Sequence, residues 1–369
     1  MNSKKKIILH IGSINRDGAS TWILTFLKHV DLEKYEVLLL VFTEVFVPNR
    51  IEQFIGNRNI AIEILNSPKY KLNPFYYYKV FKCIKKYKAD IVLNCNPQLS
   101  AIIRIVCKVL TIKNITVYQN RISSSKYLIK KLEEFTRKLS NHHIAVSTAV
   151  YNELKNINIE NKSVVFNTSD KYDGIIDVNK YRNMFNIDPN ASIYLNIARY
   201  HPQKNQKNLI LGFEKFLKSS PNSYLFLAGW GPLYEELQQL ISSKALGKNI
   251  IITGPLDDLQ NLFAFADFYI MPSYFEGLAL ASTEALGFGL PLIISNIPEF
   301  EDIKRENFIL IKGFGPNEIY EALYESSILE NRSIEKMRSN SIDKFNNDFD
   351  SKKMTQNYEN IIDYTLKND

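Results

Sequence analysis

The sequence has few of the features that mark disulfide-rich, zinc-binding or membrane-spanning proteins. Its 369 residues include only three cysteines, Cys83, Cys95 and Cys107, which are widely spaced and form no C-x-x-C pair. This spacing argues against a disulfide framework and against a zinc knuckle, and it fits a reducing cytoplasm.

Long apolar runs are also missing. The longest candidate, VLLLVFTEVFV at residues 37–47, is interrupted by Glu44, and no run reaches the roughly 18 residues that a transmembrane helix needs. The apolar stretch after the run of three lysines at residues 4–6 is too short for a signal peptide with a cleavage site. We therefore expect a soluble, cytoplasmic protein, which can still lie as a peripheral protein against the inner face of the cell membrane.

Acidic residues are scarce in the first half of the chain. Residues 1–170 contain 26 Lys and Arg but only 13 Asp and Glu, whereas the remaining residues contain 20 and 26, so the net charge of +7 is unevenly distributed. Such asymmetry predicts an anionic partner for the first half.

Short apolar runs alternate with amphipathic segments, and the alternation occurs twice. Expected strands in the first half lie at residues 5–12, 35–42, 89–96, 115–120, 142–147 and 164–167. After a polar segment at residues 168–191, further strands are expected at 192–198, 224–229, 249–254, 267–272 and 291–295. Strands that alternate with helices in this way are typical of parallel sheets covered on both faces.

The length and the repeated alternation together predict an α/β fold with two domains. A chain of 369 residues is too long for one ordinary core. We expect two Rossmann-like, doubly wound domains that face each other across a cleft. The first is residues 1–170, completed by a C-terminal helix at 352–369, and the second is residues 171–351.

Two cations follow the first expected strand of the second half. The segment NIARYHPQKN places Arg199 and Lys204 in a loop before a helix. The planar guanidinium fork and the compact ammonium charge both suit phosphate oxygens. Two solvated surface cations remain the alternative interpretation.

Glycines follow the next two expected strands. Gly229 and Gly231 open a helix, where they would let backbone amides approach a phosphate closely. The turn at Gly254–Pro255 would expose backbone groups to a planar base. The full G-x-G-x-x-G pattern of dinucleotide sites is missing, so ordinary tight turns explain these glycines equally well.

Two glutamates stand in an otherwise apolar or small stretch, YFEGLALASTEALGFGLP at residues 274–291. Glu276 ends a loop, and Glu284 falls within a short helix expected to begin near Ala281. A buried carboxylate needs hydrogen-bond donors, which the vicinal hydroxyls of a ribose would supply to Glu284; a solvent-facing Glu284 is the alternative. Three amides at the helix start would point toward a phosphate: those of Leu278, Ala279 and Leu280.

In this order and at these intervals, the motifs resemble family 4 of the retaining glycosyltransferases, which have the GT-B fold. The resemblance covers most of the chain and is strongest over residues 196–298. It implies transfer of a sugar from a nucleotide donor with retention at the anomeric carbon, with no metal and no cofactor. Arg199 and Lys204 would bind the diphosphate and stabilise its developing charge, Glu284 would hold the ribose, and Glu276 would contact the donor sugar. The remaining donor-binding residues would be Gly18, Gly229, Gly254, Leu278, Ala279 and Leu280.

The chain departs from the family pattern at two places in the first half. The first loop reads Asp17-Gly18-Ala19-Ser20 where many members have a Gly-Gly pair, and Gln119, Asn120 and Arg121 stand where many members carry a catalytic histidine. We interpret His10 as a packing residue and His201, beside Arg199, as a loop residue, with a position near the donor as the alternative for His201. The D-x-D triplet at residues 348–350 is interpreted as a helix start rather than a metal site.

The acceptor is expected to bind the first half. Residues 69–88 hold seven lysines, seven aromatic residues and no acid, and residues 127–139 form a second basic helix. Such composition suits an anionic lipid interface, with solvated helix faces as the alternative. The candidate acceptor and membrane residues are Lys79, Lys82, Lys85, Lys86, Lys130 and Lys131.

We interpret the chain as a bacterial-type glycosyltransferase that moves a hexose or N-acetylhexosamine from a nucleotide-sugar, a UDP-sugar by preference. The acceptor would be a lipid-linked or growing saccharide in the synthesis of O-antigen, capsule or another cell-surface polysaccharide. One alternative is a sugar-nucleotide epimerase on the same fold. Another is a basic nucleic-acid-binding protein, but no known reader motif appears and the second half would be unexplained, so no nucleic-acid partner is expected.

Overall fold

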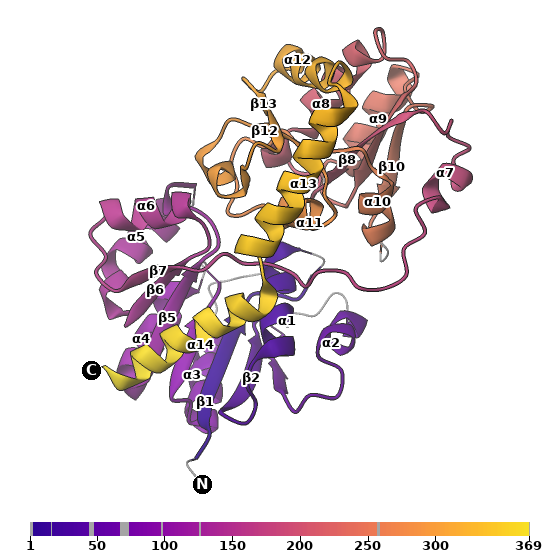
Figure 1. Ribbon diagram of the computed structural model, residues 1–369. Coiled ribbons are helices and arrows are strands. Elements are labelled where there is room, and N and C mark those ends of the chain that lie inside the picture. The colour runs from indigo at the N-terminus through magenta and orange to yellow at the C-terminus, as the bar shows by residue number, and fades with distance from the viewer. Residues whose placement is uncertain are drawn as a thin grey trace. The chain divides into compact units, whose positions relative to one another are not determined.

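Two parallel β-sheets, one in each of two units, form the framework of the structure (Figure 1). The computed structural model describes residues 3–15, 17–43, 48–66, 74–96, 99–124, 127–256 and 259–368. Unit 1 comprises Met1–Asp170 and Asp350–Asp369, and unit 2 comprises Lys171–Phe349. Unit 2 thus ends at Phe349 rather than at residue 351, because the Asp350 side chain accepts a hydrogen bond from the Lys353 amide and so caps the next helix.

The sheet of unit 1, as far as the structure describes it, has seven strands in the order β3-β2-β1-β4-β5-β6-β7, and all neighbours are parallel. The strands are β1 (Lys5–Ile11), β2 (Tyr35–Val41), β3 (Ala61–Ile64), β4 (Ile91–Asn94), β5 (Lys113–Tyr118), β6 (His142–Ala145) and β7 (Lys162–Val164). The central strands are short apolar runs that are buried almost throughout, as expected for a sheet covered on both faces. All four residues of the edge strand β3 are exposed, and sequence analysis did not identify it.

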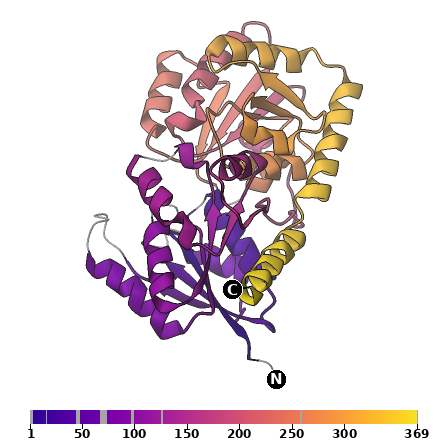
Figure 2. The same cartoon turned by 90° about the vertical axis from the view of Figure 1, so that its left-hand side faces the viewer.

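Helices lie on both sides of this sheet in Figures 1 and 2. They are α1 (Gly18–His29), α2 (Pro48–Ile55), α3 (Pro74–Tyr87), α4 (Ser100–Leu110), α5 (Tyr127–Thr136), α6 (Thr148–Asn156) and α14 (Ser351–Lys367), with short 3₁₀ turns η1 (Ile122–Ser124) and η2 (Arg137–Leu139). In both views the yellow C-terminal helix α14 lies beside the indigo α1, and the two helices are in contact. The last helix therefore belongs to the core of unit 1.

The sheet of unit 2 has six strands, within the described residues, in the order β10-β9-β8-β11-β12-β13. The strands are β8 (Ser192–Ile197), β9 (Ser223–Ala228), β10 (Ile250–Gly254), β11 (Phe268–Met271), β12 (Leu292–Ser295) and β13 (Phe308–Ile311). The helices are α7 (Lys180–Met184), α8 (Gln206–Phe216), α9 (Tyr234–Ser243), α10 (Leu259–Phe265), α11 (Leu280–Gly287), α12 (Pro316–Ser327) and α13 (Asn331–Asp348), with 3₁₀ turns η3 (Pro202–Lys204) and η4 (Pro298–Ile303). The predicted α/β class with two doubly wound parallel sheets is confirmed.

Strand order in each sheet reverses once. The reversal lies between β1 and β4 in unit 1 and between β8 and β11 in unit 2. Ligands of doubly wound sheets bind at the carboxyl ends of the strands beside such a switch point. The loops that follow β8 and β11 are therefore the first place to look for a site in unit 2.

No helix in the described part of the chain combines the length and the hydropathy that crossing a bilayer requires.

Candidate functional site

Three loops meet at the carboxyl edge of the unit 2 sheet, beside its switch point. The loop after β8 contacts the loop after β11, since the Gln203 carbonyl accepts from the Tyr274 amide (2.9 Å) and the Gln203 side chain donates to the Phe275 carbonyl (2.7 Å). The loop after β9 also contacts the loop after β8, where the Tyr200 amide donates to the Trp230 carbonyl (3.1 Å). The predicted site residues on these loops are thereby gathered at one edge.

Lys204 and Glu276 form an ion pair at the centre of this edge. The Lys204 ammonium lies 2.6 and 2.7 Å from the two carboxylate oxygens of Glu276. The Glu276 side chain is almost fully buried, and the Lys204 side chain is largely buried. A buried carboxylate requires a partner of this kind. The two contacts use two of the three donors of the ammonium group, so a ligand that enters here meets a cation already positioned by the protein.

Arg199 lies on the same loop after β8 as Lys204, and its side chain is exposed. Its backbone carbonyl accepts a hydrogen bond from the Gln206 side chain (3.1 Å), which holds the loop to the start of α8. The pKa of the nearby His201 imidazole is lowered, mainly by burial and secondarily by the positive charges of Arg199 and Lys204. His201 is therefore neutral near pH 7, and its Nδ1 accepts from the Gln203 amide.

The two glycines after β9 are required by the close approach of the chain to itself. A Cβ atom on Gly229, whose φ is 144°, would lie 2.1 Å from the Ala198 carbonyl oxygen, and one on Gly231 would lie 2.3 Å from the Tyr200 carbonyl oxygen. Neither space is available to a side chain. The glycines thus let the loop after β9 pack against the loop that carries Arg199, which favours the turn interpretation over a direct role at a phosphate.

Trp230, between these glycines, was not identified by sequence analysis. Its side chain is 58% exposed, and its ring packs on Tyr234 with centroids 4.3 Å apart. A lone aromatic residue in a glycine turn gives little signal by itself, because exposed aromatic residues occur singly on many surfaces.

Gly254 ends β10, and its carbonyl accepts from the Gly229 amide (3.0 Å). Its φ of 70° lies in the left-handed region, where glycine is unstrained. Residues 257–258 of the segment that follows lie outside the described residues. The loops after β9 and β10 are thus joined at this edge.

The segment after β11 turns sharply into α11. Ala279 has φ 27° and ψ 66° and precedes Leu280, the first helical residue. A non-glycine residue with this backbone conformation is strained, and such strain is often found at functional sites. Leu278, Ala279 and Leu280 therefore stand at the positive end of α11, where amide groups favour an anion.

Glu284 is half-buried on α11 rather than buried as sequence analysis expected. Its neighbours Thr283 and Ala285 are buried, but successive residues of a helix point about 100° apart, so apolar neighbours do not bury it. It lies near Tyr269, whose pKa is held well above its usual value by burial first and then by the charges of Glu276 and Glu284. The Tyr269 hydroxyl donates to the Ile197 carbonyl (3.1 Å).

The candidate residues of unit 1 lie at the edge of its own sheet. Gly18 opens α1, which Asp17 caps by accepting from the Ser20 amide (2.8 Å). Gln119 follows β5 and accepts from the Asn167 side chain (3.3 Å). His10 is fully buried on β1, its Nδ1 lies 2.9 Å from the Asn94 Oδ1, and burial lowers its pKa to about 4, as suits a packing residue.

The candidate lysines lie on two helices of unit 1. Lys82, Lys85 and Lys86 project from α3 into solvent, and Lys79 stacks over Phe75 with its ammonium 5.5 Å from the ring centroid. The apolar side of α3 packs into the core, so this helix is an ordinary amphipathic one. Residues 69–73 of the basic stretch lie outside the described residues. Lys130 and Lys131 are exposed on α5.

The two aspartates of the D-x-D triplet lie at helix ends. Asp350 caps α14, with 2.6 Å between its Oδ1 and the Lys353 amide, and Asp348 pairs with Lys344 (2.7 Å) at the end of α13. In the described parts of the chain, no three His, Cys, Asp or Glu side chains are grouped so as to hold a metal ion.

Known proteins resemble this chain in sequence and in structure. The model of the family described as "Glycosyl transferases group 1" matches residues 177–344, which lie in unit 2. An uncharacterized glycosyltransferase of Methanocaldococcus jannaschii is 24% identical over 99% of this chain and 100% of its own length. The UDP-Gal:alpha-D-GlcNAc-diphosphoundecaprenol alpha-1,3-galactosyltransferase of Escherichia coli is 27% identical over 59% of this chain and 60% of its own length.

Among solved structures, Anabaena HepE in complex with UDP and glucose superposes with a TM-score of 0.84 at 17% identity, and the match covers 98% of this chain and 100% of HepE. At that identity the likeness shows the fold, which is GT-B, as predicted from the sequence. By these matches the chain resembles the group 1 glycosyltransferases.

Proposed function

We propose that the chain is a retaining, metal-independent glycosyltransferase that moves a hexose or N-acetylhexosamine from a UDP-sugar to a saccharide acceptor. The observation that carries the proposal is the largely buried Lys204–Glu276 pair at the switch point of unit 2, where the loop that holds Lys204 also exposes Arg199. The choice of UDP is supported by the galactosyltransferase relative, whose name includes UDP-Gal, and by the UDP bound to HepE.

Arg199 and the free donor of Lys204 would bind the diphosphate of the donor. Fixed cations aimed at charge that develops in the transition state are among the largest catalytic terms. The amides at the start of α11 would add hydrogen bonds to the same phosphates. Glu284 would accept hydrogen bonds from the ribose hydroxyls.

Glu276 would hold the donor sugar by accepting a hydrogen bond from one of its hydroxyls. Its contact with Lys204 orients the carboxylate for this role. As the bond between the anomeric carbon and the phosphate oxygen breaks, the acceptor oxygen bonds to that carbon on the same face. The acceptor proton passes to the departing phosphate, so no enzyme nucleophile is needed.

The acceptor is proposed to be a lipid-linked or growing saccharide of a cell-surface polysaccharide, bound by unit 1. The name of the galactosyltransferase relative states a diphosphoundecaprenol acceptor for that protein, and unit 1 carries the excess of basic residues. Peripheral binding at the cytoplasmic face of an anionic membrane follows from the same charge.

Thermal stabilisation by nucleotides tests the donor site. A ligand at about 100 times its Kd stabilises the folded state by about 2.7 kcal/mol. We expect UDP to raise the melting temperature of the parent, with or without EDTA, and Arg199→Ala to melt like the parent but to lose most of the UDP shift. The matched control is Lys207→Ala, since Lys207 is an exposed cation that pairs with Glu236 on the surface.

Product analysis separates the remaining readings. Incubation with UDP-glucose and UDP-N-acetylglucosamine, with lipid-linked saccharides as acceptors, is expected to give an α-linked product by NMR. Conversion of the donor without an acceptor would indicate an epimerase. RNA binding without any nucleotide shift would contradict the proposal, and a shift by GDP alone would move the donor to a GDP-sugar.

A further inference from the structure

Helix α5 of unit 1 buries polar side chains and exposes large apolar ones, which is the reverse of an ordinary amphipathic helix. Glu133 and Thr136 are buried, whereas Leu128, Leu132 and Phe135 are 63%, 42% and 80% exposed. These three apolar residues are spaced i, i+4 and i+7, so they form one stripe along the helix. We call them the α5 stripe. A helix that places a carboxylate inside and a stripe of large apolar side chains outside contributes little hydrophobic burial to its own core.

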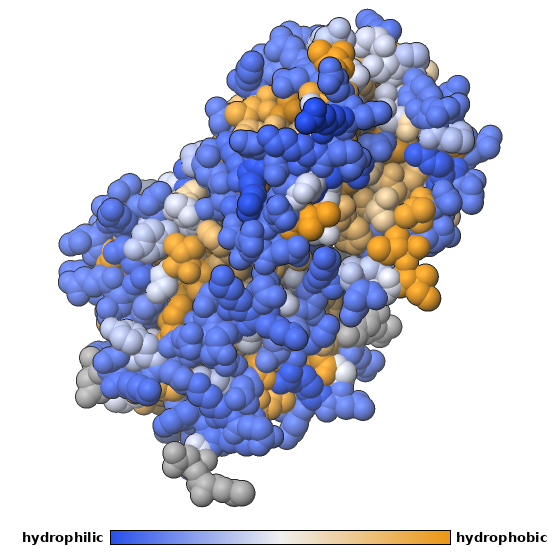
Figure 3. All heavy atoms as spheres, viewed as in Figure 1, coloured by the Kyte–Doolittle hydropathy of each residue, from blue (hydrophilic) through white to orange (hydrophobic). Residues whose placement is uncertain are grey.

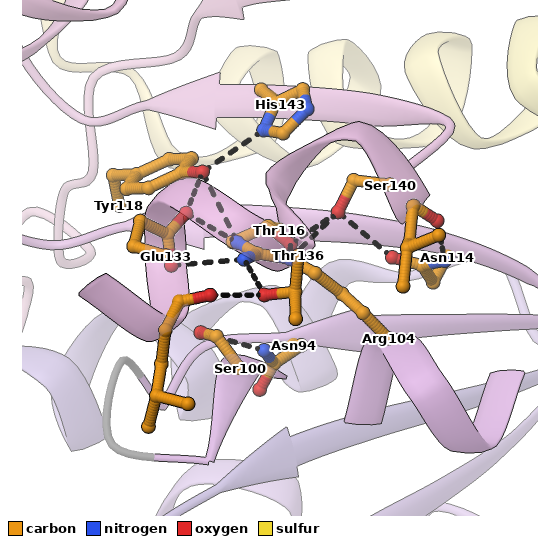
Figure 4. Close-up of polar contacts among 12 residues, drawn as sticks. Asn94, Ser100, Arg104, Asn114, Thr116, Tyr118, Glu133, Thr136, Ser140 and His143 are labelled. Atoms are coloured by element: carbon orange, nitrogen blue, oxygen red, sulfur yellow. Dashed lines mark hydrogen bonds and ion pairs between the residues drawn. The ribbon is translucent and has the colours of Figure 1, made fainter. Parts of the chain in front are cut away.

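A buried ion pair holds α5 in this orientation (Figure 4). Arg104, fully buried on α4, donates to both carboxylate oxygens of Glu133 at 2.9 and 2.6 Å and to the Thr136 hydroxyl at 3.1 Å. Its remaining donors reach the hydroxyls of Thr116 and Tyr118, both at 3.1 Å. The guanidinium group is thus satisfied on all sides, as a buried charge must be.

This network opposes an alternative rotation of α5. Turning the helix so that Leu132 and Phe135 enter the core would remove Glu133 from Arg104 and leave the guanidinium buried without a counter-charge. That cost, about 3–5 kcal/mol, offsets the roughly 3–6 kcal/mol that burying two large apolar side chains would gain. The ion pair therefore favours the orientation in which the stripe is exposed.

Neighbouring surface shares the same character. Helix α4 packs against α5 and exposes Ile105 and Val109 at i, i+4 spacing. Single exposed apolar residues need no explanation, but several on adjacent helices mark an interaction site. Figure 3 shows, on the one face drawn, apolar patches set among mainly hydrophilic residues.

We infer that the α5 stripe inserts into the headgroup region of an anionic lipid bilayer. Charge complementarity favours this occupant, because exposed lysines accompany the stripe: Lys130 and Lys131 on α5, Lys138 on η2 and Lys108 on α4, whereas Glu134 is paired with Lys131 at 3.3 Å. An apolar stripe on a helix that also carries exposed lysines is typical of interfacial helices. A second copy of the same face would bring these lysines against one another, and like charges disfavour such a contact.

Helix α3 would then have a different role from α5. Its lysines point outward while its apolar side packs into the core, so it can attract an anionic surface without inserting into it. Helix α5 also begins, after η1, at the carboxyl edge of the unit 1 sheet. This inference rests on the proposed function, since a lipid-linked acceptor bound at that edge would enter from the membrane in which the stripe is seated.

Vesicle sedimentation tests the inference on the full chain. The triple variant Leu128→Ser, Leu132→Ser, Phe135→Ser should bind vesicles of phosphatidylcholine and phosphatidylglycerol at least about ten-fold more weakly than the parent. The matched control is Ile328→Ser in unit 2, where Ile328 is also 63% exposed. It should bind like the parent. The deficit of the stripe variant should persist at high salt, whereas Lys82→Gln, Lys85→Gln, Lys86→Gln should weaken only a salt-sensitive component.

A tryptophan placed in the stripe gives a second readout that does not require loss of binding. Phe135→Trp should show a blue-shifted difference spectrum with anionic vesicles and none with phosphatidylcholine alone. Parent-like vesicle binding by the triple variant would overturn the inference. So would a dimer that the triple variant abolishes while vesicle binding is unchanged, since the occupant would then be a second copy. Vesicle binding lost only in the stripe variant, with no UDP shift in any variant, would support the α5 inference and count against the donor site.

Discussion

Trp22 of α1 and Tyr358 of α14 stack with ring centroids 5.0 Å apart and planes inclined by 13°. Both side chains are fully buried, and the Tyr358 hydroxyl donates to the Asn167 Oδ1 at 2.8 Å. A helix from the end of the chain thus fills the core of the unit formed by its beginning. Without α14, unit 1 would expose the apolar side of α1.

Tyr358→Ala should therefore destabilise unit 1 strongly. Removing a large buried aromatic side chain typically costs about 3–5 kcal/mol, and here the Asn167 amide oxygen also loses its donor. Tyr364→Ala on the same helix is the matched control, because Tyr364 is 55% exposed and should change stability by only about 0.5 kcal/mol. Urea unfolding followed by circular dichroism measures both. Equal midpoints for the two variants would contradict the role of α14 in the core.

Lys204→Ala should cost much more stability than Lys207→Ala. The first leaves the buried Glu276 carboxylate without a counter-charge, which typically costs about 3–5 kcal/mol. The second removes a cation from an exposed pair with Glu236, worth about 0–1 kcal/mol. Adding Glu276→Ala to Lys204→Ala should restore part of the loss, because the unpaired charge is then gone. Chemical denaturation of the three variants checks the order, and no recovery in the double variant would argue against direct coupling.

Gly229→Ala and Gly254→Ala should differ, although both glycines have positive φ. A Cβ on Gly229 would meet the Ala198 carbonyl oxygen at 2.1 Å, whereas a Cβ on Gly254 would meet nothing within 4 Å. Gly254→Ala should therefore cost only the backbone strain of about 1–2 kcal/mol. Gly229→Ala must also push the loop after β9 away from the loop of Arg199, so it should lose the UDP-induced thermal shift. Retention of the full shift by Gly229→Ala would show that the two loops tolerate separation.

Sequence patterns identified the strand-end residues of the site but not how they pair. Lys204 and Glu276 are each recognisable as charged residues after an apolar strand. They meet because β8 and β11 are neighbours in the sheet. Along the described chain, two strands and three α-helices separate β8 from β11. Strand order is set by packing of the whole unit, so the sequence pattern did not predict that these two side chains form an ion pair.

The sequence pattern also could not predict which side of α5 faces the core. The segment YLIKKLEEFTRKL is compatible with either side facing inward, and charged residues are normally placed outside. What decides the orientation is Arg104, which lies 29 residues before Glu133 on another helix. Strand β13 (Phe308–Ile311) was missed as well. Strand β3 was missed because all of its residues are exposed at a sheet edge, so it lacks the buried apolar run by which most of the strands were recognised.

Acid should begin to destabilise unit 1 below about pH 6.5, well above the range in which its carboxylates titrate. Burial lowers the pKa of His10 and of His142 to about 4, and burial together with the charge of Arg104 lowers that of His143 to about 3. In the unfolded chain each of these histidines binds a proton near the ordinary histidine pKa of about 6.5, whereas in the folded chain it does not. The free energy of unfolding therefore decreases as the pH falls below that value. Each histidine should contribute about 2 kcal/mol of loss between pH 7 and pH 5.

The variant His10→Gln isolates one of these contributions. It should reduce the pH dependence of the unfolding free energy between pH 7 and pH 5 by about 2 kcal/mol, whatever it does to stability at pH 7. Urea titrations at the two pH values measure this difference. An unchanged pH dependence would mean that His10 is protonated in the folded protein, which its complete burial argues against.

Arg104 and Glu133 should behave as one energetic unit. Arg104→Met leaves the Glu133 carboxylate buried without its counter-charge and should cost about 3–5 kcal/mol, as should Glu133→Leu, which leaves the guanidinium unpaired. The double variant should cost markedly less than the sum, because neither charge remains buried. Equilibrium unfolding of the parent, the two single variants and the double variant measures this interaction energy. The double variant should also bind anionic vesicles more weakly than the parent, because α5 is then free to turn its stripe inward. Additive losses with parent-like vesicle binding would show that packing other than this ion pair orients α5.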